Sequence, residues 1–521
     1  MKNVIVMVVL FFISWTIFGQ NKPDFVDIQV GPEIKTNKKE FIDKIIGKDQ
    51  DGIYVMAKYG DEMTLFYYGN DLSMKRRNSF TLEDGKRELN YRGLVQMDDE
   101  FFLFTTHTDN KEKMVYLYSQ KLDKSTLTFG DLKELGSSSF EGYKKRYTPR
   151  YSFRISADSN YVMFIADLPS ESDEPDRFSF RVFDKEMKEV WKRIGVEVED
   201  KEDDFYRYDA QIGNDGKVYI LAKVYDSSRK YKKGEINYTF DMLVYSEDEK
   251  NPDRFDVTLD NKFMSDVMFS RLQDGNIQVV GFYADQAGLQ NGVFNLLIDG
   301  ESHSVINVEA NDFPTDFIVQ HASEKEKEKA SKKEDKGKEI AFYSYDIDDL
   351  MRNPDGSITM VGEQYRFYQT CHTDANGNTS CTNHYVYGNI ILVKFDSDGA
   401  VEWMELIPKF QHTTNDGGYY SGYALAQLED GSLNLIYNDN PKNNFFHNNQ
   451  RYYTWSRSKS KTDIIMYTIQ LDGKLNRYTL FNSETEEVMS RPKVSVQIDS
   501  DEIIVLGEAK KTTKLYKVRF E

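Results

Sequence analysis

The sequence is poor in cysteine, proline and histidine. It has two Cys, 11 Pro and seven His among 521 residues. Two cysteines exclude a scaffold held by many disulfides, and so few prolines argue against a proline-rich disordered chain. The histidines are widely spaced and form no pattern typical of a metal centre. We therefore expect no metal and no cofactor.

Sequence motifs for common enzyme chemistry are also missing. We find no G-x-S-x-G nucleophile elbow, no H-E-x-x-H zinc motif, no phosphate-binding glycine loop and no dinucleotide-binding G-x-G-x-x-G. Pairs of carboxylates that could cleave glycosidic bonds remain open, because Asp and Glu are numerous and their positions in space are unknown from sequence.

An excess of positive charge is lacking as well. The 67 Lys and Arg are outnumbered by 86 Asp and Glu, for a net charge of −19. A chain this acidic repels the phosphates of nucleic acids and anionic lipid headgroups. The charge thus argues against DNA, RNA or a membrane surface as the main partner, and it leaves basic ligands, neutral ligands and divalent cations.

Long apolar runs are absent except at the N-terminus. Lys2 is followed by an apolar stretch, Val4 to Phe18, which is shorter than the roughly 20 residues that span a bilayer. Residues 1–20 therefore read as a secretory signal peptide with cleavage near Gly19/Gln20, and a retained anchor is the alternative. We expect a secreted or periplasmic protein with no membrane insertion after cleavage.

Aromatic residues are abundant, and they occur in a recurring strand-rich unit. Tyr and Phe number 34 each, and short apolar runs alternate with tight acidic turns. Such turns favour β-hairpins because Asp and Gly tolerate a positive φ at little cost. The turns fall at Asp51-Gly52, Asp98-Asp99, Asp158-Ser159, Asp215-Gly216, Asp274-Gly275, Asp355-Gly356, Asp430-Gly431 and Ser500-Asp501.

The recurrence predicts an all-β chain, with residues 21–521 forming a single β-propeller domain. Each unit has four strand candidates, which is typical of propeller blades. We expect eight four-stranded blades, with seven as the alternative. The last unit has only three strands, so Phe25–Val30 should supply its missing outer strand and close the ring. The eight units start near Glu40, Tyr91, Tyr151, Tyr206, Phe263, Asp346, Tyr419 and Pro492.

These units resemble the repeats of secreted bacterial β-propeller proteins across nearly the whole chain. They lack the Trp-Asp dipeptide of WD40 repeats and the double glycine of kelch repeats. The resemblance implies a ring of blades that often meets ligands at the face bearing its loops. It implies no particular activity and transfers no catalytic residue.

Long connections are predicted to gather on one face of the domain, because each lies between second and third strands or between blades. Loops on a rigid frame often carry function, although insertions also accumulate where they are tolerated. A charged insertion at about 322–340 should form a solvated linker or a short exposed helix. The long connections are Asp167–Arg177, Tyr225–Ile236, Pro314–Ser344, Tyr365–Tyr387, Lys409–Ser421 and Asn438–Lys461.

Three of these loops concentrate aromatic, amide and basic side chains. Such residues suit recognition because they combine large contact areas with polar groups. They could line a groove for a glycan or a peptide, or they could simply pack the loops onto the blades. The candidate ligand-binding residues are Tyr365, Arg366, Tyr368, His412, Asn415, Tyr419, Tyr420, Arg451, Tyr452, Tyr453 and Trp455.

The two cysteines, Cys371 and Cys381, lie in one predicted loop and should form a disulfide in an oxidising compartment. A zinc site that adds His372 and His384 is the weaker alternative, because the spacing lacks paired ligands. We expect Asp374 to begin an Asn-Gly turn rather than a calcium loop.

Two functions remain open. The first is a secreted noncatalytic recognition protein that binds an extracellular glycan or protein through the long-loop face. The second is a hydrolase or lyase that acts on polysaccharide. The second predicts converging carboxylates near His or Tyr with perturbed pKa values, and the first predicts clustered aromatic and amide side chains.

Overall fold

A computed structural model describes most of the chain from Gln20 onward. The described residues are 20–34, 40–85, 87–143, 147–170, 177–197, 203–226, 235–272, 274–321, 328, 332, 342, 345–445, 452–458, 461–482, 488–509 and 512–521. Residues 1–19 of the predicted signal peptide and most of the charged insertion lie outside them. No helix in the described ranges is long and apolar enough to cross a membrane.

Two compact units make up the chain, and each is described by itself. One unit comprises residues 36–260, and the other comprises residues 1–35 with 261–521. Within the described ranges each unit holds four sheets of four or five strands, antiparallel except where β1 pairs parallel with β34, and consecutive strands pair in sequence order in most of them. This meander arrangement is the one that the four-strand repeat predicted.

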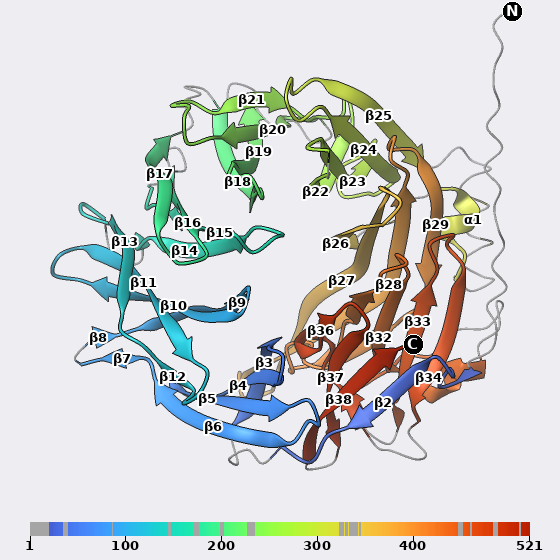
Figure 1. Cartoon of the computed structure of the whole chain (residues 1–521). Coiled ribbons are helices and arrows are strands. Elements are labelled where there is room, and N and C mark those ends of the chain that lie inside the picture. The colour runs from blue at the N-terminus through green and yellow to red at the C-terminus, as the bar shows by residue number, and fades with distance from the viewer. Residues whose placement is uncertain are drawn as a thin grey trace, which may run out of the picture. The chain divides into compact units, whose positions relative to one another are not determined.

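The unit of residues 36–260 contains β3 to β21 (blue to green in Figure 1). Its first sheet is β3 (Phe41–Lys48), β4 (Gly52–Tyr59), β5 (Glu62–Gly69) and β6 (Met74–Thr81), followed by the ribbon β7 (Glu83–Asp84) and β8 (Arg87–Glu88). The second is β9 (Asn90–Met97), β10 (Glu100–Asp109), β11 (Met114–Asp123), β12 (Thr128–Phe129) and β13 (Lys133–Ser139). The third is β14 (Arg150–Ile155), β15 (Tyr161–Asp167), β16 (Arg177–Asp184) and β17 (Glu189–Glu197). The fourth is β18 (Asp203–Ile212), β19 (Val218–Asp226), β20 (Tyr238–Tyr245) and β21 (Asp253–Asp256).

In its described ranges the other unit contains the remaining strands and some short helical segments. Its sheets begin with β22 (Phe263–Arg271), β23 (Ile277–Ala284), β24 (Gly292–Ile298) and β25 (Val305–Asp312). Next come β26 (Tyr345–Arg352), β27 (Ile358–Thr373), β28 (Thr379–Phe395), β29 (Val401–Ile407) and β30 (Gln411–Thr414). The third is β31 (Ala424–Gln427), β32 (Leu433–Asp439), β33 (Asp463–Ile469), β34 (Leu475–Phe481) and β1 (Gln20–Asn21). The last is β35 (Val488–Ser490), β36 (Val496–Asp499), β37 (Glu502–Ala509), β38 (Thr512–Phe520) and β2 (Val26–Val30). The helical segments are α1 (Thr315–Ile318), η2 (Pro441–Phe445) and η4 (Pro492–Val494).

The predicted tight turns coincide with connections between the first and second strands of the sheets. Ser159, Gly216, Gly356 and Gly431 have φ values of 58°, 75°, 85° and 84°, the left-handed conformation expected of such turns. The acidic residue also has a direct role, because Asp355 Oδ1 accepts a hydrogen bond of 3.0 Å from the backbone N–H of Ser357. The repeated aspartates therefore stabilise turns, which accounts for much of the acidic pattern.

The N-terminal strand completes the last sheet, as the sequence predicted. β2 pairs antiparallel with β38, with Val26 opposite Phe520 and Val30 opposite Tyr516. Figure 1 shows the blue β2 beside the red β38. The side chain of Val26 is buried in the same apolar cluster as Val518 and Phe520. Chain segments that are far apart in sequence thus share one core, and β2 covers an edge that β38 would otherwise expose.

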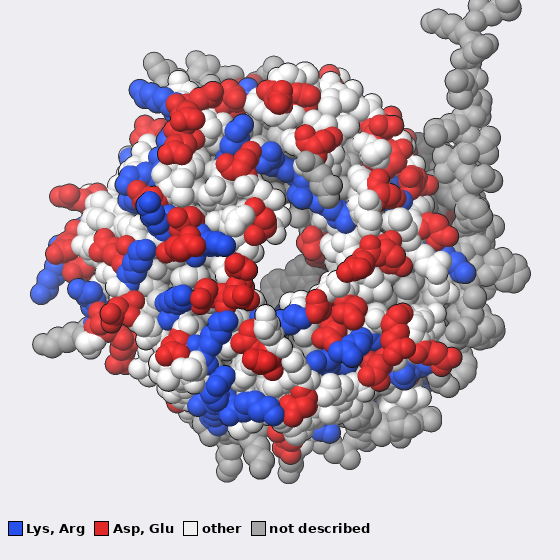
Figure 2. Space-filling view, viewed as in Figure 1, with Lys and Arg blue, Asp and Glu red and all other residues white. Residues whose placement is uncertain are grey.

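The hydrophobic cores lie between neighbouring sheets of each unit. Second and third strands such as β23 and β33 are buried along their whole lengths, so their sequences read as continuous apolar runs. Fourth strands such as β25 alternate between exposed and half-buried positions. Charged side chains of both signs are interspersed on the face seen in Figure 2, so on this face the acidic excess does not form one uniform patch.

Candidate functional site

The segment Tyr365–Tyr387, which we expected to be a loop, is a long β-hairpin. β27 and β28 pair without interruption from Tyr365↔Tyr387 to Thr373↔Thr379. Asp374 accepts backbone hydrogen bonds from Asn376 and Asn378, and these close the predicted Asn-Gly turn. The loop prediction was wrong because the Asn-Gly turn sits between two alternating runs, and that pattern is typical of a β-hairpin.

A disulfide ties the hairpin near its tip, as predicted. Cys371 and Cys381 face each other across the two strands with their Cα atoms 4.1 Å apart. Both sulfur atoms are used in this bond, so the alternative zinc set with His372 and His384 is excluded. The bond is consistent with an oxidising, extracellular or periplasmic location.

One surface of the hairpin, which we call the aromatic face, carries aligned aromatic and amide pairs. Phe367 is 51% exposed and contacts Tyr385 with ring centroids 5.3 Å apart. Toward the sheet Tyr365 contacts Tyr387 at 4.8 Å. Cross-strand pairs of this kind stabilise a hairpin. The aromatic face comprises Tyr365, Phe367, Gln369, Asn383, Tyr385 and Tyr387, and Gln369 donates to Asn383 Oδ1 over 2.9 Å.

The opposite surface holds a stack of rings. Tyr368 and His384 are parallel at 4.4 Å, and the guanidinium of Arg366 lies 5.1 Å from the Tyr368 ring. His384 Nδ1 is 3.0 Å from His412 Nε2. Desolvation, together with the charges of His384 and Arg366, lowers the pKa of His412. Three predicted site residues, Arg366, Tyr368 and His412, are therefore neighbours.

The strand β30 brings His412 to the hairpin. It pairs with β28, so the connection Lys409–Ser421 is partly a fifth strand rather than a free loop. Asn415, another predicted site residue, follows β30 with a φ of 53°. Its backbone N–H donates to Asn383 O over 3.0 Å, and its side-chain Oδ1 accepts from Asn383 N over 2.8 Å. Asn415 thus fastens this connection to the hairpin.

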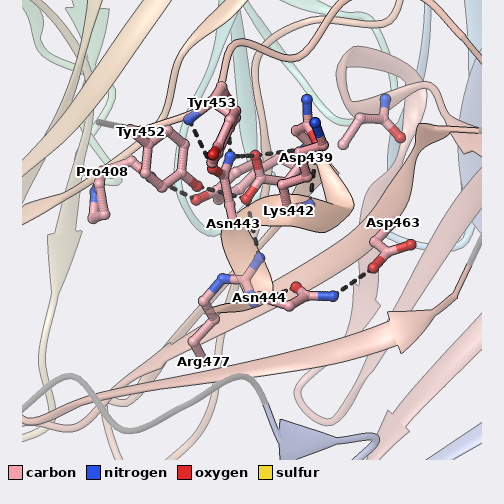
Figure 3. A network of polar contacts seen from close by, with 12 residues as sticks. Pro408, Asp439, Lys442, Asn443, Asn444, Tyr452, Tyr453, Asp463 and Arg477 are labelled. Atoms are coloured by element: carbon pink, nitrogen blue, oxygen red, sulfur yellow. Dashed lines mark hydrogen bonds and ion pairs between the residues drawn. The ribbon is translucent and has the colours of Figure 1, made fainter. Parts of the chain in front are cut away.

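The described parts of the connection Asn438–Lys461, residues 438–445 and 452–458, lie around a buried carboxylate (Figure 3). Asp439, which is 1% exposed, accepts hydrogen bonds from Tyr452 at 2.5 Å and Arg477 at 3.0 Å through Oδ2. Asn443 donates to its Oδ1 over 2.8 Å. The predicted site residue Tyr452 therefore holds this segment onto its sheet. Tyr453 lies beside this network and is 45% exposed.

Three other predicted site residues support the same region from inside. Trp455 is fully buried and donates its indole N–H to Thr462 Oγ1 over 2.8 Å. Tyr420 is buried against it and donates to Glu508, and Tyr419 donates to Glu508 over 3.2 Å. A fully buried indole has no surface for a ligand, so Trp455 acts on the surface only through packing. Arg451 lies outside the described residues.

A second group of polar residues, which sequence reasoning missed, joins β26 and β27. A β-bulge between Ile347 and Asp349 redirects Asp348, and bulges often aim side chains near functional sites. Asp348 is partly open to solvent, but desolvation by the residues around it raises its pKa to about 7, and a 2.6 Å hydrogen bond from Tyr423 opposes that rise. Asp346 lies directly opposite Glu363 in the strand register.

Buried charges complete this group. Glu363 forms a 2.6 Å ion pair with Lys409, and the two side chains are 8% and 0% exposed. Lys493 donates to the Tyr387 hydroxyl over 2.6 Å, while burial and the nearby Glu363 charge raise the pKa of Tyr387 to about 12. The only sequence signal was a Glu directly after the apolar run of β27, which is too common to single out. We call Asp346, Asp348, Glu363, Tyr387, Lys409, Tyr423 and Lys493 the acid–lysine cluster.

Solved structures similar to this chain are β-propeller proteins. The quinohemoprotein alcohol dehydrogenase of Comamonas testosteroni has 10% identity and a TM-score of 0.44 over 94% of this chain and 76% of its own. The propeller domain of the Trilobed protease from Pyrococcus furiosus has 11% identity and a TM-score of 0.31 over 74% and 95%. The polysaccharide lyase Uly1 has 11% identity and a TM-score of 0.35 over 94% and 99%. No protein-family model and no curated protein sequence matches the chain.

Proposed function

We propose that this chain is a noncatalytic recognition protein that acts outside the cytosol and binds an extracellular glycan or protein. The observation that carries the proposal is the aromatic face of the disulfide-tied hairpin. Phe367 is half exposed on this face, and Tyr365 and Tyr385 beside it are half-buried. Aromatic rings with amide groups beside them are a common recognition surface.

The rigidity of the hairpin favours binding. Continuous strand pairing and the Cys371–Cys381 bond hold the aromatic side chains in place before a ligand arrives. Binding then costs less conformational entropy than it would on an unstructured loop. Asn415 and His412 add a third strand against the base of the hairpin, which fixes it further.

The same proposal includes an eight-bladed propeller as the frame. Eight sheets of four or five strands occur in the described ranges, four in each unit. Each predicted unit start lies at or near a first strand, and β2 completes the final sheet. Secretion through a signal peptide at residues 1–20 is the route that this function requires, and the disulfide is compatible with it.

The test compares binding to glycan and extracellular-protein arrays by the mature protein and two variants. In one variant Phe367→Ser and Tyr385→Ser remove the exposed pair from the aromatic face. The control is Phe41→Ser in β3, where a phenylalanine is 44% exposed in the other unit. The proposal expects specific binding that the hairpin variant loses and the control keeps. Binding that survives in the hairpin variant, or no binding by the intact protein, contradicts it.

A second candidate function is favoured by the acid–lysine cluster. A carboxyl whose pKa is near 7 can donate or accept a proton at neutral pH, as a polysaccharide hydrolase or lyase requires. We would incubate a panel of polysaccharides with the protein and with the Asp348→Asn variant and measure new chain ends. If only the unaltered protein forms such products, the protein is a polysaccharide hydrolase or lyase and the proposal of a noncatalytic recognition protein is wrong.

A further inference from the structure

Two histidines from different strands of the same sheet present ring nitrogens to each other. His384 is on β28 and His412 is on β30, and Nδ1 of the first lies 3.0 Å from Nε2 of the second. Both side chains are half-buried, so their ring edges remain within reach of solvent. They lie on the surface of the hairpin opposite the aromatic face, and the proposed recognition surface does not use them.

We propose that His384 and His412 together bind a divalent transition-metal ion, with Cu(II) preferred. Ring nitrogens bind such ions at about 2.0–2.1 Å. Two nitrogens on one ion are then roughly 2.9 Å apart at a right angle and roughly 3.3 Å apart at the tetrahedral angle. The observed separation of 3.0 Å falls within this span. In the ion-free protein the two nitrogens share a hydrogen bond, so both rings must turn for their lone pairs to meet at a shared ion.

Hydrogen bonding prepares His384 for this role. Its second nitrogen, Nε2, lies 2.8 Å from Thr370 Oγ1. When Nε2–H donates to that hydroxyl, the proton is held there and Nδ1 keeps a free lone pair for the metal. In the ion-free protein His412 Nε2–H then donates to this lone pair, and metal binding requires that proton to move to Nδ1 of His412.

The site supplies two protein ligands and leaves the other positions to water or to a partner. In the ranges that the structure describes, no group of three or more His, Cys, Asp or Glu is placed to hold a metal. Among divalent first-row ions Cu(II) binds nitrogen ligands most tightly, which is why it is preferred here. The acidic chain also raises the local concentration of cations.

The test is a titration of the tag-free full chain with Cu(II), followed by calorimetry and by electron paramagnetic resonance. The proposal expects one Cu(II) per chain, with nitrogen couplings in the spectrum. His384→Ala and His412→Ala should each abolish this binding. Thr370→Val should keep the metal but weaken its affinity roughly 10- to 100-fold, as loss of an outer hydrogen bond does. The matched control is His372→Ala, which removes an exposed histidine from the same hairpin.

Several results would overturn the site. These are no saturable binding by the unaltered chain, binding that persists in both histidine variants, or binding lost equally in His372→Ala. Circular dichroism and an intact Cys371–Cys381 bond show whether each variant is folded. Because His384 and His412 lie on separate strands, concordant loss in two folded variants cannot arise from damage to one strand.

Discussion

Removing Lys409 should destabilise the protein far more than removing the whole ion pair to which it belongs. Lys409 and Glu363 are 2.6 Å apart, and their side chains are 0% and 8% exposed. In Lys409→Met the carboxylate stays buried without its partner, which costs about 3–5 kcal/mol of the free energy of unfolding. In the double variant Lys409→Met with Glu363→Gln neither member of this pair carries a charge. We therefore expect the free energy of unfolding to fall by less than about 2 kcal/mol.

The pH dependence of the single variant gives a second check. Burial raises the pKa of Glu363, and in Lys409→Met the more distant charge of Lys493 is left to oppose that rise. A carboxyl whose folded-state pKa exceeds its unfolded value destabilises the fold as pH rises above the unfolded value of about 4.3. The deficit of Lys409→Met should therefore be larger at pH 8 than at pH 5, and the double variant should lack this trend.

Urea unfolding followed by tryptophan fluorescence measures both effects. The control is Lys75→Met, which breaks an exposed pair with Asp71 and should cost at most about 1 kcal/mol. If the single and double variants are equally unstable, or if the deficit of the single variant does not grow with pH, the reasoning from buried charge is wrong.

Three further predictions concern other parts of the chain. Cys371→Ser should leave the sheets folded but speed hydrogen exchange in the outer hairpin, because losing the closed loop costs roughly 2.5–3 kcal/mol of local stability. Asp348→Asn should flatten a fall in melting temperature between about pH 4 and pH 7, since the folded-state pKa of Asp348 is about 7 and its unfolded value is about 3.9. Unchanged curves would contradict this. Deleting residues before Gly31 removes β2, so size-exclusion chromatography should show self-association through the uncovered edge of β38.

The sequence carried most of the information for the sheets but little for the site. Tight turns such as Asp355-Gly356 are local, since two or three residues determine their φ angles, and they were predicted correctly. β2 was also predictable, because one sheet lacked a strand and Phe25–Val30 alternates. The solvent exposure of a side chain, in contrast, depends on which residues from other parts of the chain pack against it. Trp455 and Phe367 are both aromatic residues of long connections, yet one is fully buried and the other is half exposed.

The acid–lysine cluster shows the same limit. Glu363 and Lys409 are 46 positions apart by their numbers and meet only because β27 and the segment after β29 are brought together. No local pattern marks either residue as half of a pair. The error at the hairpin Tyr365–Tyr387 was of a different kind. Its alternating residues and its Asn-Gly turn were visible in the sequence, and only the lengths of its two strands, β27 and β28, were underestimated.

The pairing of β2 with β38 also bears on the order in which the protein can fold. Val26 meets Phe520, so nearly the whole chain separates the two partners. The last sheet cannot be completed until residue 520 has been made, and closing so long a loop is slow. Until then β2 is an unpaired strand that other chains can capture. The last sheet therefore stays open until the chain has been made to its end, and its edge at β38 is covered only when β2 pairs there.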